Sequence, residues 1–191
     1  MFENFSKYLC DKADFTAAQL EQVKAVCRER KINKHEFLLQ EGTIFTCNTF
    51  VCSGLMRAFI IDDFGNEHTT NFAPENYWTG DRVSVLSGKP SLINVDAIED
   101  THLIVIEQKD FYLLNKNIEP FNTVLSGVIQ KNIVVSQELM FGSMSQSAEE
   151  KYFNFLKKYG SILNRLPHAM IASYLDITPQ ILTLIQQKHH K

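Results

Sequence analysis

The feature that most constrains the fold is a series of short apolar segments between residues 31 and 108, each ended by turn-forming residues. These segments are too short for typical helices, and they lie at 35–40, 55–61, 67–72, 91–98 and 102–106. Residues 62–66 (DDFGN) separate two of them and are typical of a hairpin turn. Many short strands at regular spacing predict an antiparallel sandwich, roll or barrel.

Helices are expected on both sides of this region. Residues 1–30 have apolar side chains spaced by three and four, with Asp14 and Thr16 as candidate N-caps of the second helical segment. After Pro120 a long stretch without proline predicts a helix over residues 118–144.

One face of this long helix has the spacing of a heptad seam, in which apolar residues recur every three and four positions. The seam consists of Phe121, Leu125, Val128, Asn132, Val135 and Leu139. Such a face packs either into the core of its own domain or against the same helix of a second copy. We expect the second arrangement, a parallel dimer helix in which Asn132 fixes the register.

Two short helices joined by a tight turn are expected between residues 166 and 188, after a helix that begins with the capping box SAEE at 147–150. Pro167 starts the first, Asp176 suits a left-handed turn, and Thr178 caps the second. This is the order of a helix-turn-helix, whose second helix enters the major groove of DNA. A plain corner of two helices has a similar pattern and remains an alternative.

Charge and cysteine content limit the class of protein. The net charge is −3, yet residues 146–191 carry six Lys or Arg against three Asp or Glu, so an acidic body precedes a mildly basic tail. No apolar run approaches the length of about 18 residues that crosses a bilayer, and the N-terminus does not resemble a signal peptide, so we expect no membrane partner and a cytoplasmic location. Cysteines at 10, 27, 47 and 52 match no zinc or iron–sulfur spacing, and we expect them to be small buried side chains.

Several short motifs occur together in a characteristic order. They are Gly42, 53–57 (SGLMR), 62–66, 72–75 (FAPE), Gly80-Asp81, 87–91 (SGKPS), 97–100 (AIED), 147–150 and 171–179 (IASYLDITP). From about residue 10 to its end the chain resembles the Crp/Fnr family of bacterial transcription regulators, particularly the short forms of Bacteroidetes-type bacteria. The resemblance implies an α+β protein. An antiparallel β-roll of the cyclic-nucleotide-binding type with flanking helices would occupy 1–117, a long dimerisation helix 118–144, and a helix-turn-helix domain 145–191.

The expected effector pocket departs from the family pattern. Family members that bind cyclic nucleotides carry Gly-Glu and, about ten residues on, Arg-Ser, because a carboxylate binds the ribose and a guanidinium binds the phosphate. Here the first pair is Gly80-Asp81 and the second is Ser91-Leu92, without a guanidinium. We therefore expect an effector other than cyclic AMP, or none, and we identify no cofactor or metal. The candidate pocket residues are Gly80, Asp81, Arg82, Lys89, Ser91, Leu92 and Asn132.

The expected recognition helix also departs from the family. Short members usually show Ser-Arg followed by Ile-Arg, whereas this chain has Thr183-Leu184-Ile185-Gln186 and lacks both arginines. Leu184 either meets a thymine methyl or is buried in a domain that no longer binds DNA. The candidate DNA-binding residues are Thr178, Gln180, Thr183, Leu184, Gln186, Gln187 and Lys188.

Together these features predict a homodimeric, effector-controlled regulator that binds a near-palindromic site on double-stranded DNA, with RNA polymerase as a further candidate partner. The main alternative is a sensor of the same fold that has lost specific DNA binding and acts through protein contacts. A second alternative is a metal enzyme with a β-barrel of the cupin type. It would need clustered histidines, whereas His35, His68 and His102 are widely spaced. We therefore expect no enzymatic activity.

Overall fold

The computed structural model describes residues 1–189, with all of their side chains except those of residues 138–145. The helices are α1 (Phe2–Cys10), α2 (Ala17–Val26), α3 (Arg82–Ser87), α4 (Gln108–Asn117), α5 (Glu119–Ser145), α6 (Ala148–Tyr159), the 3₁₀ helix η1 (Gly160–Arg165), α7 (His168–Leu175) and α8 (Pro179–His189). The strands are β1 (Arg28–Ile32), β2 (Phe37–Leu39), β3 (Cys47–Ser53), β4 (Met56–Ile61), β5 (Glu67–Ala73), β6 (Trp78–Thr79), β7 (Asn94–Ala97) and β8 (Thr101–Glu107).

The strands form two antiparallel four-stranded sheets, in the orders β1-β8-β3-β6 and β2-β7-β4-β5. This confirms the expected β-roll. The hairpin at 62–66 joins β4 to β5, and the Asp62 carboxylate accepts hydrogen bonds from the backbone amides of Phe64 and Asn66. The helical interpretation of residues 1–30 was wrong at its end, because β1 begins at Arg28 and pairs with β8.

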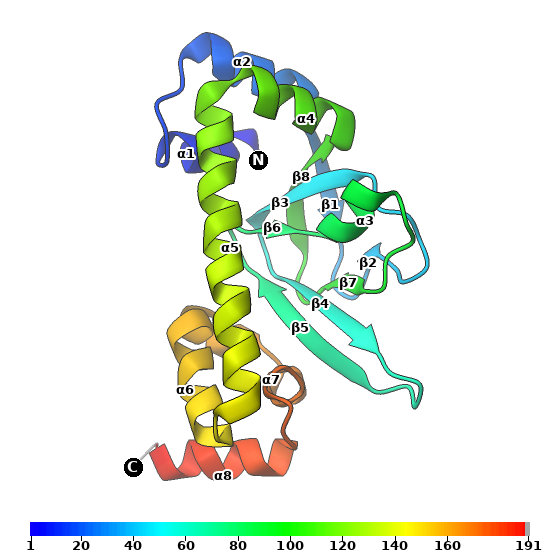
Figure 1. The fold of residues 1–191 in the computed structure, drawn as a ribbon, viewed down its shortest axis with the longest axis vertical. Helices are drawn as coiled ribbons and strands as arrows, with labels where there is room; N and C mark the ends of the chain where they lie inside the picture. Colours follow the sequence, from blue (N-terminus) through cyan, green and yellow to red (C-terminus); the bar gives the residue numbers. More distant parts are fainter. Residues whose placement is uncertain (190–191) are drawn as a thin grey trace.

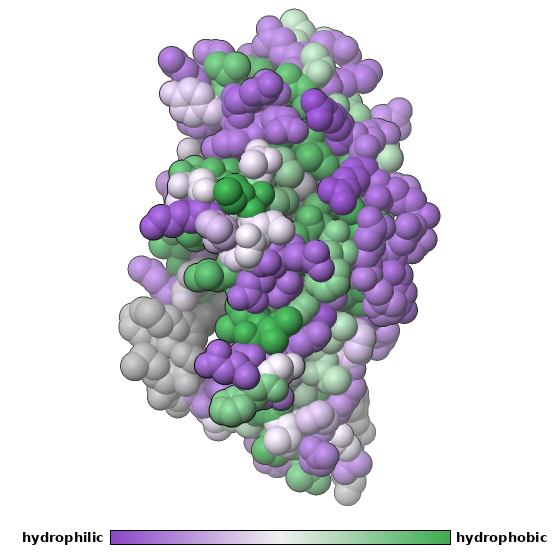
Figure 2. Space-filling view, turned by 90° about the vertical axis from the view of Figure 1, so that its right-hand side faces the viewer, coloured by the Kyte–Doolittle hydropathy of each residue, from purple (hydrophilic) through white to green (hydrophobic). Residues whose placement is uncertain are grey.

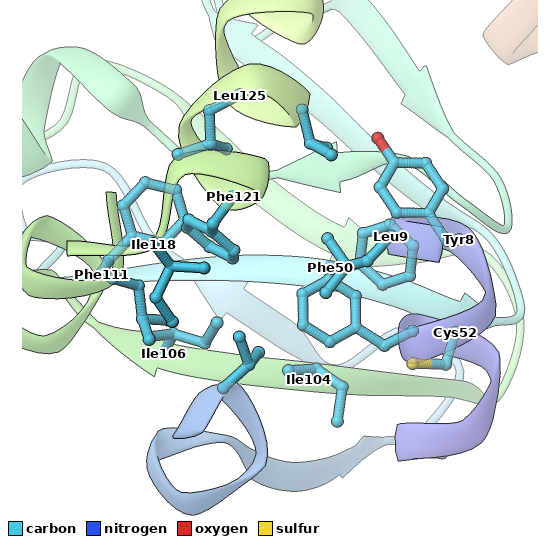
Figure 3. Close-up of a cluster of buried hydrophobic side chains, with 14 residues drawn as sticks. Tyr8, Leu9, Phe50, Cys52, Ile104, Ile106, Phe111, Ile118, Phe121 and Leu125 are labelled. Atoms are coloured by element: carbon cyan, nitrogen blue, oxygen red, sulfur yellow. The ribbon is translucent and has the colours of Figure 1, made fainter. Parts of the chain in front are cut away.

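The long helix α5 runs beside the roll and connects it to α6, α7 and α8, which lie at the opposite end of the molecule from α2 and α4 (Figure 1). Phe121 is fully buried and Leu125 is nearly so, in a cluster with Phe50, Ile104 and Phe111 of the same domain. Figure 3 shows this cluster between α5 and the strands.

The expected dimer seam is therefore corrected at its first two positions. Phe121 and Leu125 pack into their own domain, and Val128 and Asn132 continue the same face and line a cavity. Val135 is half-buried, and the side chain of Leu139 lies outside the described residues. Apolar spacing identifies a buried face, but it carries no information about whether the covering surface belongs to the same chain.

The expected local signals of the C-terminal region are present. Ser147 and Glu150 form the capping box of α6, and Asp176 has a left-handed conformation with φ 54°. The hydroxyl oxygen of Thr178 accepts a hydrogen bond from the Ile181 amide at 3.3 Å, so Thr178 caps α8. A small core shared by α7 and α8 holds this corner together, and it contains Ile171, Ala172, Leu175, Leu182 and Ile185. We call residues 147–189 the head.

The head packs directly on the roll. Its core includes three buried roll side chains, Leu55, Phe72 and Ile98. Strand β5 of the β4–β5 hairpin lies beside α7 (Figure 1). On the face seen in Figure 2, hydrophobic residues are mixed with hydrophilic ones. Among the described residues, no helix is both long enough and apolar enough to span a membrane.

Candidate functional site

A cavity of about 620 Å³ lies between the roll, α3 and α5. Its apolar wall contains Phe45, Val85, Phe111, Leu125, Val128 and Ile129, and its polar groups are mostly uncharged, including Asn48, Thr49, Asn71, Thr79, Asn132 and Gln137. The size is that of a small-molecule site, and the lining suits a largely apolar molecule with a few hydrogen-bonding groups.

The structure brings four of the seven candidate pocket residues to this cavity, namely Gly80, Asp81, Arg82 and Asn132. The other three, Lys89, Ser91 and Leu92, do not line it. Ser91 is buried but directed at Asp81, and Leu92 is 76% exposed. Placing these three in the pocket was therefore wrong, because the turn after α3 directs them away from it.

Gly80 is required by its surroundings. Its φ is 117°, and a Cβ at this position would collide with the ring of Phe45. The glycine therefore allows Phe45 to close this end of the cavity.

The carboxylate of Asp81 is already used by the protein. One oxygen accepts from the Val83 and Ser84 amides at 2.8 and 3.2 Å and caps α3, and the other accepts from the Ser91 hydroxyl at 2.8 Å. Arg82 is the one Lys or Arg among the described residues of the lining, and its side chain is exposed. The cavity therefore has neither a free carboxylate for a ribose nor a buried cation for a phosphate.

The candidate DNA-binding residues all lie on α8 or at its start. Leu182 and Ile185 face the head core, whereas Thr178, Gln180, Thr183, Leu184, Gln187 and Lys188 are exposed and Gln186 is half-buried. Leu184 is 65% exposed, so the structure contradicts the alternative in which this side chain is buried in the head. Lys188 already contacts the Glu149 carboxylate at 3.0 Å within the head.

Three contacts fasten the head to the roll, and sequence reasoning missed them all. The Arg165 guanidinium donates to both Glu75 and Glu99 over distances of 2.7–3.0 Å. Ser173 accepts from the Thr69 amide and donates to the Glu67 carbonyl. Tyr159 donates to Asn71 at 2.6 Å. The partners lie 66 to 106 residues apart in the chain, so no local spacing could have revealed them.

The electrostatics of the arginine contact favour charged partners. Burial opposes ionisation of Glu75, but hydrogen bonds from Arg165 and from the Gly54 amide outweigh it and hold the pKa of Glu75 below its ordinary value. The hydrogen bonds that Arg165 donates to Glu99 and Glu75 raise the pKa of Arg165 above its ordinary value. The contact is therefore an ion pair at neutral pH.

The cysteines differ in their surroundings. Cys52 is buried, Cys27 and Cys47 are partly so, and Cys10 is exposed, which corrects the expectation that all four are buried. Among the described residues, no group of three or more His, Cys, Asp or Glu side chains is placed to hold a metal ion.

Comparison with known proteins agrees with this architecture. Residues 29–117 match the cyclic nucleotide-binding domain family. The transcriptional activator protein Anr of Pseudomonas aeruginosa is 25% identical over 149 residues, which cover 78% of this chain and 60% of that protein, so the chain spans less than two thirds of the relative's length.

Solved structures extend the similarity to the fold of nearly the whole chain. FixK2 from Bradyrhizobium japonicum superposes with a TM-score of 0.75 at 17% identity, covering 86% of this chain and 85% of its own. A transcriptional regulator of the Crp/Fnr family from Eubacterium rectale superposes with a TM-score of 0.67 at 19% identity, covering 93% and 84%. The chain is thus similar in fold to regulators of the Crp/Fnr type over most of its length, and its residues 29–117 match the cyclic nucleotide-binding domain family.

Proposed function

We propose that this protein is a homodimeric DNA-binding transcription regulator in which residues 1–117 bind an effector, 118–144 dimerise and 145–191 bind DNA. The observation that carries the proposal is the α7–α8 corner, which buries Leu182 and Ile185 of α8 in the head core and turns a mainly polar face of α8 outward. Two-fold symmetry would place two such helices about 34 Å apart, one turn of DNA, on a near-palindromic site. RNA polymerase is a further candidate partner.

Dimerisation would use the part of α5 that does not pack on the roll. Ile133 and Val134 are 53% and 52% exposed, which is unusual for two adjacent apolar residues in the middle of a helix. A second α5 packed there would cover both side chains. It would also lie beside the cavity, because Ile133 belongs to the lining.

We propose an uncharged, mostly apolar effector rather than a cyclic nucleotide. The support is the engagement of Asp81 with α3 and Ser91, together with the exposed position of Arg82. Calorimetric titration with cyclic AMP is expected to give no saturable heat. Micromolar or tighter binding of cyclic AMP would contradict this effector class.

A second candidate function is a sensor that acts through protein contacts without binding DNA. It is favoured by the exposed face of α8, which carries Leu184 at 65% exposure and no arginine among its described residues. Arginine is the commonest reader of guanine, so its absence weakens one route to specificity. Gln180 and Gln186 remain as candidate readers of adenine.

Selection from random DNA duplexes distinguishes these two functions. We expect a near-palindromic site to be enriched at about 50 mM salt and bound more weakly at about 200 mM, with a shallow salt dependence because few cations are present. Gln180→Ala is expected to relax specificity at one base position per half-site, at a cost of about 1–3 kcal/mol. Gln22→Ala, at an exposed glutamine of α2 at the opposite end of the molecule from α8, is the matched control. A folded dimer that enriches no site, alone or with cell extract added, would favour the sensor.

A further inference from the structure

The cavity and the head meet at one side chain, Asn71 of β5. Asn71 belongs to the lining of the cavity, and its Oδ1 accepts a hydrogen bond from the Tyr159 hydroxyl of the head at 2.6 Å. Tyr159 itself does not belong to the lining. Asn71 therefore lies at the cavity and also contacts the head.

The backbone of β5 explains how one residue reaches both places. Asn71 pairs with Ala58, but the next pair is Phe59 with Thr69, so Thr70 is an extra residue that forms a β-bulge. A bulge redirects the side chains beside it. Beyond the bulge, ordinary strand alternation sends Phe72 into the head core and Ala73 into the roll, and Asn71 beside the bulge contacts the head and lines the cavity.

The free edge of β5 faces the head. In its sheet β5 is the last strand, so its outer backbone groups have no strand partner. Side chains of the head supply that partner. Ser173 accepts from the Thr69 amide at 2.9 Å, and the Tyr159 oxygen accepts from the Phe72 amide at 3.4 Å.

Tyr159 is well suited to a fixed donor role. Its side chain is 1% exposed, and its ring packs edge-on against Phe72 at 5.5 Å between centroids. Burial raises the pKa of Tyr159, so its hydroxyl keeps its proton across the physiological range. The hydroxyl therefore donates to Asn71 while its oxygen accepts from Phe72.

We propose that Asn71 couples the cavity to the head, because an effector that donates a hydrogen bond to Asn71 Oδ1 competes with Tyr159 for that oxygen and loosens the head from β5. This inference rests on the proposed effector site and concerns its regulation. Coupling of this kind is reciprocal, so loss of the Asn71–Tyr159 bond must also change affinity in the cavity. Asn71 is accordingly a positioning residue whose role is to transmit occupancy of the cavity.

Hydrogen–deuterium exchange of the full chain tests the contact without any ligand. Tyr159→Phe and Asn71→Ala should each speed exchange in β5 and α7 about three- to tenfold, as expected for one lost buried hydrogen bond. The double variant should exchange no faster than Tyr159→Phe alone, since Tyr159→Phe already removes the bond to Asn71 together with the acceptor of the Phe72 amide. Tyr152→Phe, the same change on a buried ring of the same helix, is the matched control and should leave both segments unchanged.

The fluorophore N-phenyl-1-naphthylamine, a neutral apolar molecule with one N–H donor, tests the link to the cavity. It should bind the wild-type chain and speed exchange in α7, and Tyr159→Phe should alter its affinity several-fold while Tyr152→Phe does not. Equal affinity of Tyr159→Phe and Tyr152→Phe for the fluorophore, or unchanged exchange in Asn71→Ala, would refute the coupling. Either result would leave the proposed effector site standing. Failure of the probe to bind would instead contradict the apolar effector class, and the ligand-free exchange would still decide whether Asn71 holds the head.

Discussion

Arg165 makes a testable contribution to the docking of the head. Its guanidinium forks onto Glu99 at 3.0 and 2.7 Å and onto Glu75 at 2.9 and 2.9 Å, so one head residue joins two separate segments of the roll. Arg165→Met removes all four bonds and leaves the two carboxylates close together. Arg165→Lys keeps the charge but loses the fork, so it should recover only part of the docking.

The size of the effect follows from exposure. The side chains of Arg165, Glu75 and Glu99 are 31%, 36% and 34% exposed, so water screens both pairs to a large extent. Each forked pair is then worth about 0.5–1 kcal/mol, and both together about 1–2 kcal/mol. At about 1.4 kcal/mol per factor of ten, Arg165→Met should shift the docking equilibrium about 5- to 30-fold toward the released head.

The assay is hydrogen–deuterium exchange at the amides that docking protects. The Thr69 amide donates to Ser173 of the head and the Phe72 amide donates to Tyr159 of the head, so both report on docking. Exchange at these amides should accelerate by the factor above, whereas Lys188→Met, which breaks an ion pair inside the head, should have no effect. Unchanged exchange in Arg165→Met, or equal acceleration in Lys188→Met, would refute the reasoning.

Three further predictions concern stability, pH and thiol reactivity. Arg57→Met should lower the free energy of unfolding in urea by about 3–5 kcal/mol, because it leaves the buried Asp96 carboxylate without its partner. Adding Asp96→Leu should restore part of the loss, and equal stability of the single and double variants would contradict this. Because the docked head holds the pKa of Glu75 low, docking should be complete above about pH 4.3 and should weaken as the pH falls further. X-ray scattering should show the radius of gyration rising before far-ultraviolet ellipticity is lost. Burial raises the pKa of Cys27 to about 12 and those of Cys47 and Cys52 to about 11, so at about pH 8 iodoacetamide should label exposed Cys10 first in the native chain; rapid labelling of all four would refute this.

Local signals in the sequence were reliable where one residue and its near neighbours decide the structure. The hairpin at 62–66, the capping box at 147–150 and the left-handed Asp176 all depend on contacts within a few residues. Steric limits and backbone hydrogen bonds of this range act in any fold, and so they can be read before the fold is known.

Contacts between distant segments could not be predicted in the same way. The seam spacing identified a buried face of α5, but Phe121 packs against Phe111 of α4, in a core cluster of the same chain. Likewise Arg165 looked like an ordinary basic residue of the tail until the fold placed Glu75 and Glu99 around it. Ser91 and Leu92 were assigned to the pocket by their match to the family's second motif, and Lys89 as a nearby cation, but none of the three lines the cavity.

Because the head hydrogen-bonds the edge of β5, a fragment without the head should behave differently from the full chain. A sensor fragment that ends before α6 would present the Thr69 and Phe72 amides and the Glu67 carbonyl to solvent along an open strand, next to Phe72 without its aromatic neighbours. Such a strand recruits other strands, so the isolated roll is prone to self-association or aggregation. Within the full chain, the same open edge of β5 is exposed whenever the head is released from the roll. The proposed control of DNA binding and the protection from aggregation would thus depend on the same few hydrogen bonds.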